Sequence, residues 1–269
     1  MPTLRLAPWA AALALAAPLH AQQTGPCTFT KDQTYWSDAS ERYCEQRVER
    51  IPRPSGPLAI DAGQNGSIGV RGTDGDSIVV TERIETVAST EAEARAMAGE
   101  IHIVTAGGTI HAEGPAEKRH FSHWLVSYRV TAPHKIDLAL DAQNGSLRVS
   151  DIASTMRLNT VNGAIELDAV GGDVRARGEN GSLDIALSGK RWAGTGLDAE
   201  TENGPVDLTL PDGYAAHIEV GTVNGPMDIG IPMTIEGHVN LKHLSTDLGG
   251  GGPTIRAITT NGPVSIKRE

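Results

Sequence analysis

Residues 144–149 read Asn-Gly-Ser-Leu-Arg-Val, and residues 162–167 repeat the pattern as Asn-Gly-Ala-Ile-Glu-Leu. The pattern is an Asn-Gly pair followed by two apolar residues at alternate positions, and recurrence of such a unit predicts a repeat architecture. Its seven copies begin at Asn65, Asn144, Asn162, Asn180, Asn203, Asn224 and Asn261. From residue 144 onward the spacings are 18, 18, 23, 21 and 37 residues, and a degenerate copy with Ser245 in the Asn position fits inside the longest gap.

The residues before each Asn-Gly pair alternate as well. Met156 and Leu158 stand six and four residues before Asn162, with the polar Arg157 between them, and the other repeats from residue 138 onward are similar. Alternation with a period of two on both sides of Asn-Gly predicts two short strands per repeat, each with one buried face. The fold class that we predict is therefore all-β.

The near-constant phase of the copies favours a parallel β-solenoid, in which each repeat forms one coil and equivalent positions stack about 4.8 Å apart. In such a stack the Asn side chains hydrogen-bond from coil to coil, and Gly provides the positive φ of the corner. The predicted structural Asn ladder comprises Asn144, Asn162, Asn180, Asn203, Asn224 and Asn261. An antiparallel β-meander with Asn-Gly hairpins is the alternative, although hairpins do not require the same phase on both flanking strands.

Residues 128–133, Tyr-Arg-Val-Thr-Ala-Pro, precede the regular repeats. Together with the repeats they resemble the bacterial β-strand-repeat family called Domain of Unknown Function 4097, whose members are often labelled putative adhesins. The resemblance covers about residues 56–269. It implies a β-solenoid on the exported side of a cell envelope and supplies no active-site residues. The stretch between residues 70 and 133 departs from an even array, and we expect irregular coils there.

Residues 1–21 have the features of a cleaved signal peptide, with Arg5 ahead of a short apolar run and small residues before Gln22. The run is too short to span a bilayer, so we expect a protein that is not membrane-spanning and is periplasmic or secreted. In that oxidising setting Cys27 and Cys44 are expected to form a disulfide. Two free thiols are the alternative.

The rest of the chain divides into three predicted parts. Residues 22–55 form a disulfide-bearing N-terminal segment that ends in a Pro-rich linker, residues 56–133 form the irregular coils, and residues 134–269 form the regular solenoid. One short helix is expected in the middle part, because Thr90 and Glu93 make a capping box and Gly99 closes an Ala-rich run. We expect the N-terminal pieces to cap the first coil, since solenoid ends expose edges.

The composition excludes several classes of function. The chain has 23 Lys and Arg against 33 Asp and Glu, a net charge of −10, and no basic run, which argues against nucleic acid as a partner. No nucleophile elbow, phosphate loop or zinc-protease motif occurs, so we assign no catalytic residue and no cofactor. The four histidines between His102 and His123 are expected to be solvated side chains, and no metal site is assigned.

The residue between the two apolar positions after each Asn-Gly pair points outward in this fold. Successive coils place carboxylates there, and we call this row the acidic column: Glu166, Asp184, Asp207 and Asp228. Adjacent carboxylates would repel by about 1 kcal/mol even in water. The hypothesis is that the column recruits divalent cations or a basic partner, and a solvated acidic face screened by salt is the simpler alternative.

The repeat of 23 residues contains an insertion with Lys190, Arg191 and Trp192. We call these three residues the candidate contact loop, because an exposed basic and aromatic tip on a rigid scaffold is suited to binding. The alternative is a tolerated insertion whose Trp packs back on the coil.

Two function classes fit these features. The first is an exported, non-enzymatic cell-envelope protein, a putative adhesin or interaction scaffold that contacts an envelope protein or a glycan. The alternative is a carbohydrate-active β-helix enzyme, a polysaccharide lyase or hydrolase, which would need suitably placed carboxylates in a groove. Only three Trp follow the leader, so aromatic platforms for sugars are scarce.

Overall fold

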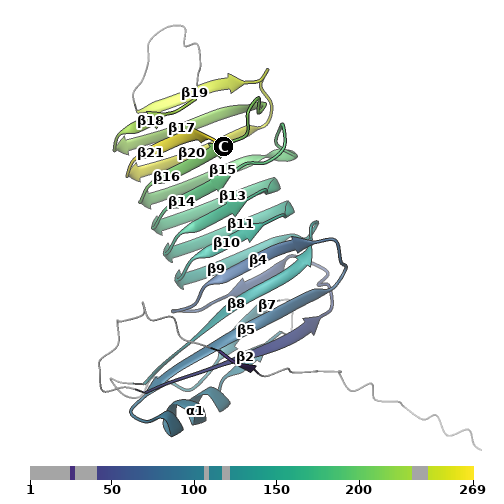
Figure 1. The fold of residues 1–269 in the computed structure, drawn as a ribbon, viewed down its shortest axis with the longest axis vertical. Coiled ribbons are helices and arrows are strands. Elements are labelled where there is room, and N and C mark those ends of the chain that lie inside the picture. The colour runs from purple at the N-terminus through teal and green to yellow at the C-terminus, as the bar shows by residue number, and fades with distance from the viewer. Residues whose placement is uncertain (1–24, 28–40, 106–108, 117–121, 232–241) are drawn as a thin grey trace, which may run out of the picture.

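The computed structural model describes residues 25–27, 41–105, 109–116, 122–231 and 242–269, and these residues form two sheets and one helix, α1 (Glu91–Gly99) (Figure 1). The strands of the first sheet, which we call sheet I, are in spatial order β1 (Gly25–Pro26), β2 (Glu41–Ile51), β5 (Ile78–Ala88), β8 (His123–Pro133), β4 (Ile68–Thr73), β10 (Leu147–Ser150), β12 (Ile165–Asp168), β14 (Leu183–Ala186), β16 (Val206–Leu210), β21 (Val264–Arg268) and β18 (Met227–Ile229). Those of sheet II are β19 (His243–Leu248), β17 (Ala216–Asn224), β20 (Thr254–Asn261), β15 (Gly194–Asn203), β13 (Gly171–Asn180), β11 (Ala153–Asn162), β9 (Leu138–Asn144), β3 (Leu58–Asp61), β7 (Thr109–Glu113) and β6 (His102–Val104).

Each Asn-Gly pair joins a strand of sheet II to a strand of sheet I, and we call such a pair of strands a rung. The rungs stack along the long axis of the molecule, between the region of α1 and β19 (Figure 1). Neighbouring rungs pair in parallel and in register, so that Leu147 lies beside Ile165 and Ile165 beside Leu183. The alternative of an antiparallel meander is therefore wrong, and the all-β fold with parallel-rich sheets is confirmed.

The space between the two sheets is filled by the apolar residues of each rung. Both sheets supply alternate side chains to it, because successive residues of a strand point to opposite faces. The column on sheet I runs through Leu147, Ile165, Leu183, Val206, Val264 and Met227. The facing column on sheet II runs through Leu140, Leu158, Ala176, Ala199, Ala257 and Val220, all of them buried.

The spatial order of the last rungs differs from their order in the sequence. The C-terminal rung, β20 with β21, lies between the rung of β15 and β16 and the rung of β17 and β18. The degenerate copy that we expected around Ser245 is not a further parallel rung. It is β19, which pairs antiparallel with β17, so that Ser245 lies beside Glu219 at the edge of sheet II.

The corner between the sheets is a continuous line of Asn side chains. In each hydrogen bond, Nδ2 of one Asn donates to Oδ1 of the Asn on the next rung. The bonds run from Asn144 to Asn65 (3.2 Å), Asn162 to Asn144 (2.7 Å), Asn180 to Asn162 (3.0 Å), Asn203 to Asn180 (3.0 Å), Asn261 to Asn203 (2.8 Å) and Asn224 to Asn261 (2.8 Å). Every amide inside the line both donates and accepts, which fixes the register of neighbouring rungs.

The glycine after each Asn is needed for a different reason from the one we predicted. In the described part of the chain, positive φ values occur at other glycines and at Asp151 and Ala169, and not at the glycines that follow Asn, so the expected left-handed corner is wrong. Instead, a Cβ at Gly163 would overlap the carbonyl oxygen of Gly145 on the preceding rung, and the same holds at Gly181 against Gly163. Only a residue without a side chain lets the rungs approach this closely.

A buried threonine completes the corner in four rungs. The Thr160 hydroxyl donates to the carbonyl oxygen of Gly145 at 2.9 Å, and Thr201 bonds in the same way to Gly181. Thr222 and Thr259 make the equivalent bonds to Gly262 and Gly204. All four threonines are buried, so each hydroxyl finds in the glycine carbonyl the hydrogen-bond partner that its burial requires. The longer motif Thr-x-Asn-Gly is the sequence signal of this bond.

The N-terminal strands extend sheet I beyond the first rung. Strand β2 pairs antiparallel with β5 along its whole length, and β5 pairs antiparallel with β8, which lies beside β4. The described strands of the segment 22–55, β1 and β2, therefore share sheet I with the strands that follow them. Cys27 and Cys44 form the expected disulfide, with a Cα–Cα distance of 5.6 Å.

The predicted helix is confirmed as α1, and Thr90 caps it by accepting a hydrogen bond from the backbone N–H of Glu93 at 3.2 Å. The helix packs on β2 and β5 through the buried Ala94 and Ala98. The buried Thr86 hydroxyl of β5 donates to the carbonyl oxygen of Ala94 at 2.8 Å, which ties the helix to the sheet. Residues 1–21, the predicted signal peptide, lie outside the described residues.

We predict that Gly163→Ala lowers the free energy of unfolding by about 2 to 3 kcal/mol, because the new methyl group forces two rungs apart at the corner. Gly75→Ala is the matched control, since a Cβ at Gly75 meets no atom within 4 Å. Urea unfolding followed by circular dichroism measures both variants. Equal, small losses in the two variants would contradict the close-contact account of the corner.

Candidate functional site

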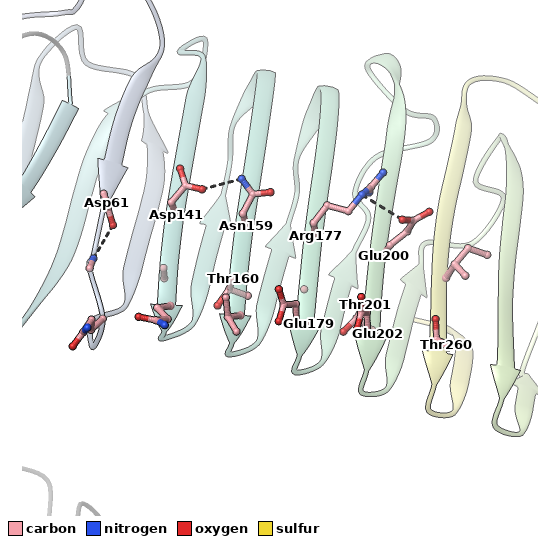
Figure 2. A pocket seen from close by; sticks show the side chains of 17 residues that line it. Asp61, Asp141, Asn159, Thr160, Arg177, Glu179, Glu200, Thr201, Glu202 and Thr260 are labelled. Carbon is pink, nitrogen blue, oxygen red and sulfur yellow. Dashed lines mark hydrogen bonds and ion pairs between the residues drawn. The ribbon is translucent and has the colours of Figure 1, made fainter.

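A hollow of polar lining lies on the outer face of sheet II, and we call it the groove. It has a volume of about 840 Å³ and crosses β3, β9, β11, β13, β15 and β20 (Figure 2). Its walls are two rows of outward-facing side chains, placed three residues and one residue before the Asn of successive rungs from residue 141 onward. Asp61, four residues before Asn65, joins the first row because it pairs in register with Asp141. Because the strands are in register, each row follows the long axis of the molecule.

The first row has two acceptors, two donors, a third acceptor and an apolar end, in the order Asp61, Asp141, Asn159, Arg177, Glu200 and Ile258. The described contacts hold its polar members in place. Asp61 accepts a hydrogen bond from the backbone N–H of Gly63 at 2.8 Å. Asn159 donates from Nδ2 to Oδ1 of Asp141 at 2.9 Å, and Nε of Arg177 lies 3.3 Å from Oε2 of Glu200 (Figure 2). The polar groups of this row are thus oriented before any ligand arrives.

An ion-pair network fixes one end of the groove. Arg177 contacts Asp198 at 2.5 Å, Arg256 contacts Asp198 at 2.7 Å, and Arg256 also contacts Glu200. Partial burial alone would raise the pKa of Asp198, but hydrogen bonds from the two guanidinium groups outweigh it and hold the pKa below its usual value. Asp198 therefore stays ionised at neutral pH, and the network gives Arg177 and Glu200 fixed positions in the groove.

The second row is open to solvent and contains Gln143, Val161, Glu179, Glu202 and Thr260. Glu179 and Glu202 lie on neighbouring rungs, both are exposed, and neither forms an ion pair with any residue that the structure describes. Ionised carboxylates accept hydrogen bonds from hydroxyl, amide and ammonium groups. The groove can therefore bind an extended polar chain that presents such donors.

The acidic column lies on the outer face of sheet I, away from the groove. Glu166, Asp184 and Asp207 are in-register neighbours, but Ser265 of the C-terminal rung separates Asp207 from Asp228. The expectation of four adjacent carboxylates is therefore wrong for Asp228. Basic side chains compensate Glu166 and Asp207: Arg148 makes two hydrogen bonds of 2.6 Å to Glu166, and Nζ of Lys267 lies 3.3 Å from Asp207. Asp184 instead accepts a 2.7 Å hydrogen bond from the Ser182 hydroxyl.

The candidate contact loop is not the exposed basic and aromatic tip that we expected. Trp192 is buried, and its Nε1 donates a 2.9 Å hydrogen bond to the carbonyl oxygen of Gly172. Lys190 and Arg191 are exposed. The indole therefore packs back on the rungs, as the alternative proposed, and only two basic residues remain at the tip.

The described residues contain neither a candidate metal cluster nor a candidate membrane-spanning helix. Among them, His, Cys, Asp and Glu form no group of three or more that could hold a metal ion. His111 lies 3.6 Å from Glu113, and His120 lies outside the described residues. In the same part of the chain, the structure contains no apolar helix of the length that a bilayer crossing requires.

A carboxyl group is buried beneath the N-terminal strands. Glu82 of β5 is 2% exposed, and it lies opposite the buried Tyr128 of β8. Within the described residues, Oε1 of Glu82 and the Tyr128 hydroxyl have no hydrogen-bond partner. Burial, reinforced by the charge of Glu49 and opposed by that of Arg47, raises the pKa of Glu82 to about 7.

The groove was missed by the sequence analysis, which followed the row after Asn-Gly and not the rows before it. The signal was available three residues before each Asn, where polar residues recur at Asp141, Asn159, Arg177 and Glu200. Their types vary from rung to rung. A pattern based on one residue type therefore does not detect them.

The fold and the groove define an all-β protein with two parallel-rich sheets and a polar outer face. The chain belongs to the Toastrack DUF4097 family, whose model matches residues 127–267. No curated protein matches the chain.

Several solved structures are similar at low sequence identity. A putative cell adhesion protein from Clostridium sporogenes is 11% identical, with 84% of this chain and 100% of that chain covered and a TM-score of 0.39. A putative adhesin from Bacteroides fragilis is 15% identical, with 83% and 97% covered and a TM-score of 0.38. A putative lipid binding protein from Parabacteroides distasonis is 9% identical, with 82% and 96% covered and a TM-score of 0.34.

We predict that Asp184→Asn raises the free energy of unfolding by about 0.5 kcal/mol in low salt, because Asp184 lies between Glu166 and Asp207 on neighbouring strands. The gain should shrink in 1 M salt, which screens the repulsion. Asp173→Asn is the control, since Asp173 lies between Thr155 and Gly196. A different result would instead support a cation site in the column. In that case the melting midpoint of the wild type would rise with calcium and fall with chelator, and the midpoint of Asp184→Asn would respond to neither.

We also predict a pH-dependent effect of Glu82→Gln. The raised pKa means that the native protein binds this proton more tightly than the unfolded chain does, so stability is lost as the pH rises from about 4.5 to about 7. The variant should match the wild type at pH 4 and exceed its unfolding free energy at pH 8 by up to about 3 kcal/mol. Urea unfolding at both pH values measures this, with the exposed Glu179→Gln as control. An equal effect at the two pH values would contradict the assignment.

Proposed function

We propose that this protein is an exported cell-envelope protein, periplasmic or secreted, that acts as a non-enzymatic binding scaffold in the manner of an adhesin. The observation that carries the proposal is the groove, which crosses six strands of sheet II with its polar side chains held by ion pairs and hydrogen bonds. A preorganised polar surface binds without a large loss of conformational entropy. Binding is therefore the use that this surface supports best.

The proposed architecture is a β-solenoid of Asn-Gly repeats. The in-register pairing of both sheets and the Asn line at the corner support it. Stacked rungs of this kind contact mainly their neighbours, and they present long, nearly flat faces suited to extended partners. Loops or faces on a rigid scaffold can then change in sequence without loss of the fold.

The proposed ligand of the groove is an extended envelope glycan or a polar polypeptide segment. Glu179 and Glu202 would accept hydrogen bonds from its hydroxyl or amide groups, and Arg177 would donate to its oxygens. The side chains that line the groove include no Trp, Tyr or Phe. Recognition would therefore depend on hydrogen bonds more than on stacking.

Export is supported by two features of the chain. The Cys27–Cys44 disulfide is typical of proteins in oxidising compartments. Residues 1–21 have the charge and apolar pattern of a cleaved leader. We propose that the mature chain begins near Gln22.

The groove is tested by a charge reversal that leaves the ion-pair network intact. Glu179→Arg with Glu202→Arg should reduce binding of the purified protein to envelope extract and to a glycan array by at least about tenfold, since both exposed carboxylates change sign. Asp168→Arg with Asp173→Arg is the matched control, because both residues are exposed and lie outside the groove.

Equal binding by the two double variants would contradict the groove as the binding site. A depolymerisation assay on the same polysaccharides tests the alternative function. Depolymerisation of any polysaccharide by the wild type, lost in the groove variant, would replace the scaffold proposal by the polysaccharide lyase or hydrolase.

A further inference from the structure

A second hollow lies on the outer face of sheet I, on the opposite side of the molecule from the groove. It has a volume of about 340 Å³ and lies over β5, β8, β4 and β10. These four strands are adjacent in sheet I (Figure 1). Its floor is Gly69 of β4. A Cβ built on Gly69 meets no atom closer than the carbonyl oxygen of Tyr128 at 4.0 Å, so the missing side chain leaves open space above the strand.

Three arginines surround this floor. Arg129 and Arg148 are the in-register neighbours of Gly69 on its two sides, on β8 and β10. Strands in a sheet are about 4.8 Å apart, so the two arginine backbones are separated by about 10 Å across the glycine. Arg83 of β5 is displaced by two residues from Thr81, the partner of Arg129, and such diagonal neighbours are about 7 to 8 Å apart.

The charge of the hollow is opposite to that of the whole chain. Arg83, Arg129 and Arg148 line it, whereas no Asp or Glu does, although the chain carries a net charge of −10. Arg83 pairs with Glu85 at 2.6 Å, and Arg148 pairs with Glu166. Arg129 is exposed and forms no ion pair with any described residue. The hollow thus retains about one uncompensated positive charge.

Several of the remaining lining residues carry hydrogen-bond donors that suit a hydroxylated ligand. The hydroxyls of Ser67 and Ser127 each accept a hydrogen bond from a backbone N–H, at 3.2 Å, and keep their own hydrogen atoms for donation. Gln46 and Thr81 contribute an amide and a further hydroxyl. A guanidinium centre within a rim of hydroxyl and amide groups matches an oxyanion carried on a sugar better than a bare ion.

We propose that this hollow binds a carboxylate- or sulfate-bearing sugar residue of an acidic polysaccharide. Its oxyanion lies over Gly69 between Arg129 and Arg148, and Arg83, the serines and Gln46 contact its oxygens. The site is on the other sheet from the groove and does not depend on the proposed function. Each arginine belongs to a strand of the sheet, so the site is rigid and needs no closing movement.

The test is isothermal titration calorimetry in low salt with four probes: polygalacturonate, dextran sulfate, neutral dextran and sodium sulfate. We expect at least one of the two acidic polymers to bind, neutral dextran not to bind, and Arg129→Gln to weaken the binding by at least about tenfold. Arg157→Gln is the matched control, because Arg157 is an exposed arginine on the outer face of sheet II, and it should bind as the wild type does.

Gly69→Glu gives a second test, since it places a carboxylate inside the hollow where a side chain has room. It should abolish binding, whereas Gly69→Gln should retain part of it, and unchanged thermal midpoints would show that both variants fold. The proposal is overturned if neither acidic polymer binds, or if Arg129→Gln and Arg157→Gln bind equally. It is also overturned if sodium sulfate binds as tightly as the polymers, which would indicate a site for free anions only.

Discussion

The whole structure depends on the contact at the Asn-Gly corner. There the backbone of one glycine lies against the carbonyl oxygen of the glycine on the neighbouring rung, and the Asn beside it hydrogen-bonds to the Asn of the next rung. A contact this close tolerates no side chain, and the amide line tolerates no shift along the strand. The corner therefore sets the register of both sheets, and the apolar columns between them follow from that register.

Register also decides what the outer faces present. A residue at a fixed offset from Asn-Gly becomes part of a row that follows the long axis. Each rung contributes one side chain to each row, so the side chains at that offset determine the charge and polarity of the row. On sheet I one such row passes from Arg129 and Arg148 to Glu166, Asp184 and Asp207, from a basic to an acidic end. On sheet II the corresponding rows form the groove. The inward residues of each strand must stay apolar to fill the core, whereas the outward residues can change in type without loss of the fold.

Part of this fold is readable from the sequence because it depends on local patterns. The alternation around each Asn predicts the strands and their buried faces, and Thr90 with Glu93 predicts the helix that the structure contains. The spatial order of the last rungs cannot be predicted from the sequence, because every Asn-Gly copy can pair with every other. Sequence order alone therefore placed Asp228 next to Asp207. The corner glycines were expected to provide a positive φ, but they are needed because the neighbouring rung leaves no room for a Cβ. A sequence does not show how closely two backbones approach. Trp192 illustrates the same limit: its hydrogen bond to Gly172 depends on a neighbouring rung.

The corner is tested most directly by nuclear Overhauser contacts between the side-chain amides of Asn, measured with selective labelling of asparagine. Neighbouring rungs are about 4.8 Å apart and second neighbours about 10 Å, so only neighbours give a contact. The account predicts contacts from Asn203 to Asn261 and from Asn261 to Asn224, with none between Asn203 and Asn224. A contact between Asn203 and Asn224, or the absence of contacts along the line, would contradict it.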